Sequence, residues 1–259
     1  MPPFIQSATH YFVICCFQYP RSMRYHDRKD IKSMVLALTI QKTYATPVIL
    51  VGGGDIAWQQ LEAINCSSYP VIGVDGGAVS LHEKGIIADL IIGDLDSVSN
   101  INSFPASIET IKLEEQQTTD FEKALYSIDA PLFICFGFWG NRLDHCMSAL
   151  HVLTKYRGQK CVVIVDQADF LFTPHGKIDL ELSLKTRFSI YPLEATTFTA
   201  SSGLLYPLVG LTLKAGDAIG TSNETNSTRI RISPTNDTQV NYVVILPNSE
   251  LGAVLSSIF

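Results

Sequence analysis

Between residues 46 and 158, short runs of apolar residues alternate with segments of helical spacing. The apolar runs include "PVILV", "PVIGV", "ADLII" and "APLFICF", and the helical segments include "AWQQLEAI", "TTDFEKALYSI" and "LDHCMSALHVLTKY". Strands that are apolar along their whole length belong to a sheet covered on both faces, which is typical of parallel sheets with helical connections. We therefore expect residues 46–158 to form an α/β domain with a parallel, Rossmann-like sheet.

The pattern changes after residue 158. The run "KCVVIVD" and the segments "DLELSLKTRFSIYPL", "TRIRIS" and "NYVVILP" are strand-like, and several alternate apolar and polar residues with a period of two. No helix is expected here before the last few residues. We expect residues 159–259 to form an all-β sandwich of antiparallel strands.

Residues 1–45 fit neither pattern, and we expect an N-terminal extension that need not be ordered. Met34 is a plausible alternative start. The run "YFVICCF" in this extension is too short to span a bilayer, which needs about 20 residues. Positive charges follow this run instead of preceding it, which argues against a secretion signal. We therefore expect no association with membranes.

Composition narrows the class of protein further. Of the 259 residues, 46% are hydrophobic and 17% are charged, so the chain has ample material for a core. The net charge of −6 argues against a dedicated nucleic-acid binder, which usually carries a basic patch. The six cysteines form no C-x-x-C and have no histidines at zinc-ligand spacing, so we expect reduced thiols in the cytoplasm.

Acidic residues follow two of the predicted strands. Asp94 and Asp96 end the run "LIIGDLD", and Asp75 and Gly76 follow the strand in "VDGGA". Ligands of open α/β sheets bind outside the carboxyl ends of the strands. In an extended segment residues i and i+2 point the same way, so Asp94 and Asp96 would share one target. Carboxylates suit Mg²⁺, but an aspartate that starts a turn is an open alternative at each position.

A third acidic residue comes at the start of a predicted helix. In "QQTTDFEKAL", Thr119 and Glu122 have the spacing of a capping box, and Asp120 in the first turn favours the helix dipole. Helix capping explains this segment completely. It still leaves Asp120 free to reach a metal ion near the ends of the strands.

The segment "GNRLDH" leads from a glycine-rich loop into another predicted helix. Arg142 could bind a phosphate through two parallel hydrogen bonds, and Asp144 could orient Arg142 or cap the helix. His145 could act as a base or make a structural hydrogen bond. Together with the aspartates and the glycine turn "GGGD", these residues describe a site for magnesium and a polyphosphate. The sequence G-x-x-x-x-G-K-[ST] is absent from the chain, which excludes a P-loop enzyme.

The order of these motifs resembles the thiamine pyrophosphokinase family. The matching elements are "VDGGA", "IGDLDS", "EQQTTDFEKAL", "GNRLDH", "GLLYPLVG" and "GTSNE", and the resemblance runs from about Ile49 to Leu246. It implies transfer of the pyrophosphoryl group of ATP to the hydroxyethyl oxygen of thiamine, which gives thiamine diphosphate and AMP. It also implies an N-terminal α/β domain that binds ATP and Mg²⁺, a C-terminal β-sandwich that binds thiamine, and a homodimer with active sites at the subunit interface.

The resemblance implies a role for each matching residue. Four aspartates would hold Mg²⁺ and the reacting phosphates: Asp75, Asp94, Asp96 and Asp120. Gly76 and Gln116 would lie beside them, Arg142 and Asp144 would contact ATP, and Ser222 and Asn223 would face thiamine across the dimer interface. The catalytic group would comprise Asp96, Asp120, Arg142 and Asp144, with either Asp96 or Asp120 as the acceptor of the alcohol proton.

The chain departs from the family pattern in two places. Family members often carry a second acidic residue where this chain has Gln117, with Glu115 two residues earlier. Some eukaryotic members have a tryptophan soon after "TSN", whereas Glu224 follows here, as in the bacterial branch. Two alternatives stay open: a non-catalytic sensor of thiamine or a nucleotide, and a magnesium-dependent phosphotransferase for a related alcohol. The presence of all four aspartates argues against the sensor.

Overall fold

A computed structural model describes residues 40–64, 68–95, 104–105, 107–236 and 241–258. Within Thr39–Phe259 the contacts form one compact unit. The predicted extension lies outside the described residues except for its end, where β1 (Lys42–Thr43) pairs in parallel with β6 (Ile128–Asp129). No helix of the described ranges is long and apolar enough to cross a membrane.

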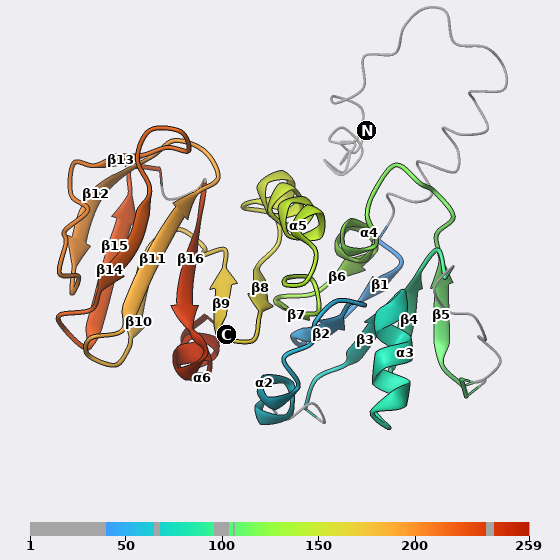
Figure 1. The fold of residues 1–259 in the computed structure, drawn as a ribbon. Helices are drawn as coiled ribbons and strands as arrows, with labels where there is room; N and C mark the ends of the chain where they lie inside the picture. The colour runs from blue at the N-terminus through green and yellow to red at the C-terminus, as the bar shows by residue number, and fades with distance from the viewer. Residues whose placement is uncertain (1–39, 65–67, 96–103, 106, 237–240, 259) are drawn as a thin grey trace, which may run out of the picture. The chain divides into compact units, whose positions relative to one another are not determined.

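Six parallel strands form one part of a ten-stranded sheet, in the order β8-β7-β2-β3-β4-β5 (Figure 1). Five of them are buried along their whole length, as the apolar runs predict, and β5 is the exposed edge. The strands are β2 (Val48–Val51), β3 (Val71–Val74), β4 (Leu90–Gly93), β5 (Glu109–Lys112), β7 (Phe133–Phe136) and β8 (Val162–Val165).

Four helices connect these strands and cover both faces of the sheet. Figure 1 shows α2 and α3 on one face and α4 and α5 on the other. The chain runs outward from β2 in both directions, so the strand order reverses between β2 and β7. The helices are α2 (Trp58–Ala63), α3 (Gly76–Glu83), α4 (Asp120–Ser127) and α5 (Leu143–Tyr156).

The large sheet continues beyond β8 with antiparallel strands in the order β9-β16-β11-β14. The sequence pattern groups the run "KCVVIVD" with this second half, but its strand β8 pairs in parallel with β7. One sheet therefore joins both halves of the described chain. The antiparallel strands are β9 (Asp169–Phe172), β11 (Arg187–Pro192), β14 (Gly220–Glu224) and β16 (Tyr242–Pro247).

A second, four-stranded sheet has the order β10-β15-β12-β13. Its strands β10 and β15 alternate buried and exposed residues, as the period of two predicts. Phe198 of β12 packs edge-on against Tyr242 of β16, with ring centroids 5.3 Å apart, so side chains of both sheets share one core. The strands are β10 (Ile178–Glu181), β12 (Thr196–Ser202), β13 (Thr212–Leu213) and β15 (Arg229–Pro234), and the chain ends with η4 (Asn248–Glu250) and the expected helix α6 (Leu251–Ile258).

Candidate functional site

A cavity of about 720 Å³ opens at the carboxyl ends of β2, β3 and β7. Its wall comes from the turns after these strands and from the first residues of α4 and α5. This position is the point where the strand order reverses, which is where open α/β sheets bind their ligands. The lining segments are Gly52–Gly54, Val74–Gly76, Thr119–Phe121 and Gly137–Arg142, joined by side chains from the start of α5.

Close packing of backbone explains much of the glycine content around the cavity. A Cβ on Gly54 would lie 2.6 Å from the carbonyl oxygen of Gly137, and one on Gly77 would lie 2.5 Å from the carbonyl carbon of Val51. Real Cβ atoms do not approach backbone so closely. The "GGGD" and "VDGGA" turns therefore need glycine for packing, whether or not a phosphate lies against them.

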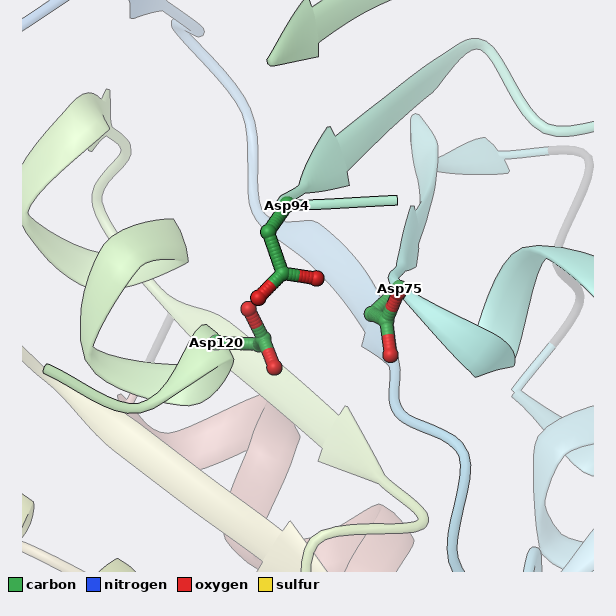
Figure 2. A group of neighbouring side chains, drawn as sticks. All are labelled: Asp75, Asp94 and Asp120. Atoms are coloured by element: carbon green, nitrogen blue, oxygen red, sulfur yellow. The ribbon is translucent and has the colours of Figure 1, made fainter. Parts of the chain in front are cut away.

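Three aspartates from separate elements meet beside this cavity. Asp75 follows β3, Asp94 follows β4 and Asp120 begins α4, and one carboxylate oxygen of each lies within 4.8 Å of the others (Figure 2). All three side chains are partly buried. Asp96, the fourth predicted ligand, lies outside the described residues. Three oxygen donors at this spacing can hold a hard divalent cation.

Asp75 has two features that are typical of a ligand-binding residue. Its backbone has φ 47° and ψ −121°, a conformation that is costly for a residue with a side chain. Its Oδ1 atom is buried and accepts no hydrogen bond from the described residues. A buried carboxylate oxygen without a donor is costly unless a cation or a water molecule completes its shell, so this atom fits a metal ligand.

Lys123, which is not among the predicted site residues, forms part of the same cluster. Its Nζ lies 3.0 Å from Oδ1 of Asp120 and 3.3 Å from Oδ2 of Asp94, and its side chain is only 2% exposed. Burial raises the pKa of Asp120, and the hydrogen bond from Lys123 opposes this rise only in part. Burial alone would lower the pKa of Lys123, but its bonds to the two carboxylates raise it. The i, i+3 spacing in "DFEK" was the signal for this contact.

Gln116 lies beside the cluster, as predicted, and donates from Nε2 to Oδ2 of Asp94 at 3.1 Å. Its loop is held by Glu115, which accepts hydrogen bonds from the backbone N–H of Gln117 at 2.8 Å and of Thr118 at 3.1 Å. Burial alone would raise the pKa of Glu115, but bonds from Thr118, Gln117 and Tyr126 lower it. Glu115 therefore braces the loop.

The start of α4 forms only half of the predicted capping box. Oγ1 of Thr119 accepts a hydrogen bond from the backbone N–H of Glu122 at 3.3 Å, as predicted. The Glu122 carboxylate instead forms an ion pair with Lys155 and accepts from the hydroxyl of Tyr156 at 3.2 Å. The expected return bond from Glu122 to Thr119 is therefore replaced by contacts that join α4 to α5.

Arg142 and Asp144 form a two-pronged ion pair where the cavity meets solvent. Nε and Nη2 of Arg142 lie 3.1 Å and 2.6 Å from the two oxygens of Asp144, which also accepts from the backbone N–H of His145 at 3.0 Å. The hydrogen bond to Arg142 lowers the pKa of Asp144. Both side chains are exposed and line the cavity together with His145. Asp144 therefore orients Arg142, one of the two predicted alternatives.

Ser222 and Asn223 lie on β14, and neither is among the described residues that line the cavity. Asn223 is buried, and its amide donates to the carbonyl oxygen of Tyr206 at 2.7 Å and accepts from the N–H of Tyr206 at 3.0 Å. This side chain thereby braces the "GLLYPLVG" loop. The loop exposes the large apolar side chains Leu205, Tyr206 and Val209.

Comparisons with known proteins agree with the motifs. Residues 61–165 match the family model described as "Thiamin pyrophosphokinase, catalytic domain". "Thiamin pyrophosphokinase 1" of Caenorhabditis elegans is 28% identical over 156 residues, which cover 54% of this chain and 64% of the relative. "Thiamine pyrophosphokinase" of Bacillus subtilis is 28% identical over 167 residues, which cover 59% of this chain and 77% of the relative. The matched region thus spans less than two thirds of the nematode protein.

Solved structures of the same kind share the fold. The crystal structure of thiamine pyrophosphokinase from Bacillus subtilis has a TM-score of 0.64 at 23% identity and covers 78% of this chain and 98% of its own. The yeast enzyme has a TM-score of 0.63 at 15% identity and covers 81% of this chain and 92% of its own. At such identities the structures support the fold alone. The mixed α/β architecture and the family resemblance that the sequence predicts are both confirmed.

Proposed function

From the relationship of this chain to the thiamine pyrophosphokinases, we propose that it transfers the pyrophosphoryl group of ATP to thiamine, which gives thiamine diphosphate and AMP. The main support for this proposal is the cluster of carboxylates beside the cavity, formed by Asp75, Asp94 and Asp120. All three lie inside the segment that matches the catalytic domain of the family. A site for a metal ion and a polyphosphate is what such a reaction requires.

The residues present fit Mg²⁺ as the metal. Asp75, Asp94 and Asp120 supply hard oxygen donors, and Oδ1 of Asp75 is buried without a donor from the described chain. These three residues, together with Asp96, would hold the ion. Bound there, Mg²⁺ would neutralise charge on the reacting phosphates.

The reaction would be an in-line displacement at the β-phosphorus of ATP. The hydroxyethyl oxygen of thiamine forms the new P–O bond, the bond to the α-phosphate oxygen breaks, and AMP leaves. Arg142 would bind phosphate oxygens through its guanidinium group, which the two hydrogen bonds to Asp144 orient. Asp96 and Asp120 are the candidate acceptors of the alcohol proton.

We also propose where thiamine binds and how the protein assembles. Residues 46–158 would be the catalytic domain that binds ATP and Mg²⁺, and residues 159–259 the β-sandwich that binds thiamine. Since Ser222 and Asn223 lie on β14 and not on the cavity wall, this strand would serve the active site of a second subunit in a cytoplasmic homodimer. Asn223, whose buried amide is bonded to Tyr206, would do so by holding the "GLLYPLVG" loop and not by facing thiamine itself. The exposed apolar side chains of the "GLLYPLVG" loop support a protein contact there.

The test is to incubate the purified protein with ATP, thiamine and Mg²⁺ and to identify the products by mass spectrometry. A parallel reaction without Mg²⁺ is the control. Thiamine diphosphate with AMP, formed only in the presence of Mg²⁺, is the expected result. Thiamine monophosphate with ADP would contradict the proposal, and bound but unchanged thiamine would favour a sensor.

A further inference from the structure

We infer that Lys123 is the fixed counter-charge of the acidic cluster: it holds Asp94 and Asp120 together from behind and limits how strongly the cluster attracts a divalent cation. Lys123 is thus a positioning residue that acts through the two carboxylates. The inference rests on the proposed function in one respect only, because it takes the cluster as the cation site.

The position of the ammonium group is the first support. Nζ lies 3.0 Å from Asp120 and 3.3 Å from Asp94, so one charge bridges two carboxylates that come from different elements. The side chain is 2% exposed. A lysine is almost never buried this deeply unless it is paired, and removing its partners would strand the charge. The bridge therefore fixes α4 against the end of β4.

The arrangement of the cluster relative to the cavity is the second support. Asp75 and Asp120 line the cavity, whereas Lys123 is not among its lining residues. Oδ1 of Asp75 has no donor from the described residues, while Asp94 and Asp120 already share Lys123. The ammonium thus occupies the side of the cluster away from the cavity. A cation that enters from the cavity therefore meets the carboxylates of Asp75 and Asp120 on the side opposite the ammonium.

The net charge of the cluster sets how strongly it attracts a divalent cation. The three described carboxylates and the one ammonium leave two negative charges, and Asp96 would add a third, so a divalent cation meets an excess of negative charge even with Lys123 in place. Without Lys123 the same carboxylates would repel one another more strongly and attract a divalent cation more strongly. The lysine would thereby keep the cluster assembled before the cation arrives and keep cation binding weak enough to be reversible.

A direct contact between Lys123 and a substrate phosphate is the competing role. That role requires the ammonium to reach the cavity, which its 2% exposure opposes. The two roles differ in a measurable way. Loss of a phosphate contact would weaken nucleotide binding and leave the affinity for the cation alone unchanged, whereas loss of a counter-charge changes the affinity for the cation without any nucleotide.

The experiment measures binding of Mn²⁺ to the full chain without nucleotide, by electron paramagnetic resonance of free Mn²⁺, at a pH where the carboxylates are ionised. Lys123→Met removes the charge, and Lys123→Gln removes it but keeps a hydrogen-bond donor. Lys155→Met is the control. Lys155 lies on α5, its side chain is 50% exposed, and it pairs with Glu122, which is on the same helix α4 as Lys123. We expect the dissociation constant for Mn²⁺ to fall at least about tenfold in both Lys123 variants and to stay unchanged in the control.

Thermal unfolding with and without Mn²⁺ gives a second readout. The inference predicts that Mn²⁺ raises the Tm of the Lys123 variants more than that of the wild type, so a variant that unfolds without metal is still informative. Unchanged or weaker Mn²⁺ binding in both variants would overturn the inference. Absence of Mn²⁺ binding in the wild type and the variants would overturn it too, whereas formation of thiamine diphosphate by the wild type would leave the proposed function standing.

Discussion

Replacement of Gly77 by alanine should destabilise the fold and damage the site together. Gly77 is the second residue of α3 and is buried against the end of β2. An added Cβ would lie 2.5 Å from the carbonyl carbon of Val51, 2.9 Å from that of Gly52, and closer still to the carbonyl oxygen of Val51. These are backbone atoms, so no rotamer change relieves the clash. Helix α3 has to move away from β2.

The size of the effect follows from this geometry. Overpacking of a core costs about 1–3 kcal/mol, and a clash with backbone belongs at the upper end of that range. About 3 kcal/mol corresponds to a fall in Tm of about 6–12 °C for a chain of this size. Because Asp75 directly precedes α3, its carboxylate moves as well, and we expect turnover to fall at least about tenfold.

The assay is thermal unfolding followed by circular dichroism, together with turnover of ATP and thiamine. Gly252→Ala in α6 is the matched control, because no neighbouring atom lies within 4 Å of an added Cβ there. This control should gain up to about 1 kcal/mol and keep full turnover. A Gly77→Ala protein whose Tm lies within about 2 °C of the wild type and whose turnover is unchanged would refute the packing argument.

Three further predictions concern the acidic cluster, its loop and the second sheet. Asp120→Asn should lower turnover at least about 100-fold while circular dichroism shows an intact fold; near-normal turnover would rule Asp120 out of the site. Glu115→Gln should lower turnover about tenfold, since this carboxylate accepts the N–H groups of the loop that holds Gln116; an unchanged rate would show that the loop keeps its shape without it. The hydrogen bond from Arg229 lowers the pKa of Asp179 to about 2, so its stabilisation is present above the unfolded pKa and is lost as the pH falls towards 2. The stabilities of Asp179→Asn and the wild type, measured in urea, should therefore differ near neutral pH and converge at about pH 2, and a constant difference would contradict this.

The central part of the candidate site could be predicted because it depends on topology. Carboxyl ends of parallel strands share one edge of the sheet, so residues that follow β3 and β4 meet there, as Asp75 and Asp94 do. Asp120 joins them because α4 begins at the same edge. Lys123 was not predicted, because a lysine in an amphipathic helix is normally exposed. Only its spacing of three residues from Asp120 indicated that the two side chains could form an ion pair.

The division of the chain was harder to predict for a physical reason. An apolar run such as "VVIV" is equally compatible with a parallel and an antiparallel neighbour, because both leave it buried. Strand β8 has one of each, β7 in parallel and β9 in antiparallel pairing, so the sheet continues where the periodicity changes. Periodicity reports burial of side chains on each face and contains no information about the direction of the next strand.

The most direct test of the account follows the fate of both terminal phosphates of ATP in one reaction. With thiamine, Mg²⁺ and ATP labelled at both the β- and γ-phosphates, we predict that both labels appear together in thiamine diphosphate and that one AMP forms for each thiamine consumed. The Asp94→Asn protein should show neither product. Transfer of the γ-label alone, or labelled thiamine diphosphate from Asp94→Asn at the rate of the wild type, would contradict pyrophosphoryl transfer at this acidic cluster.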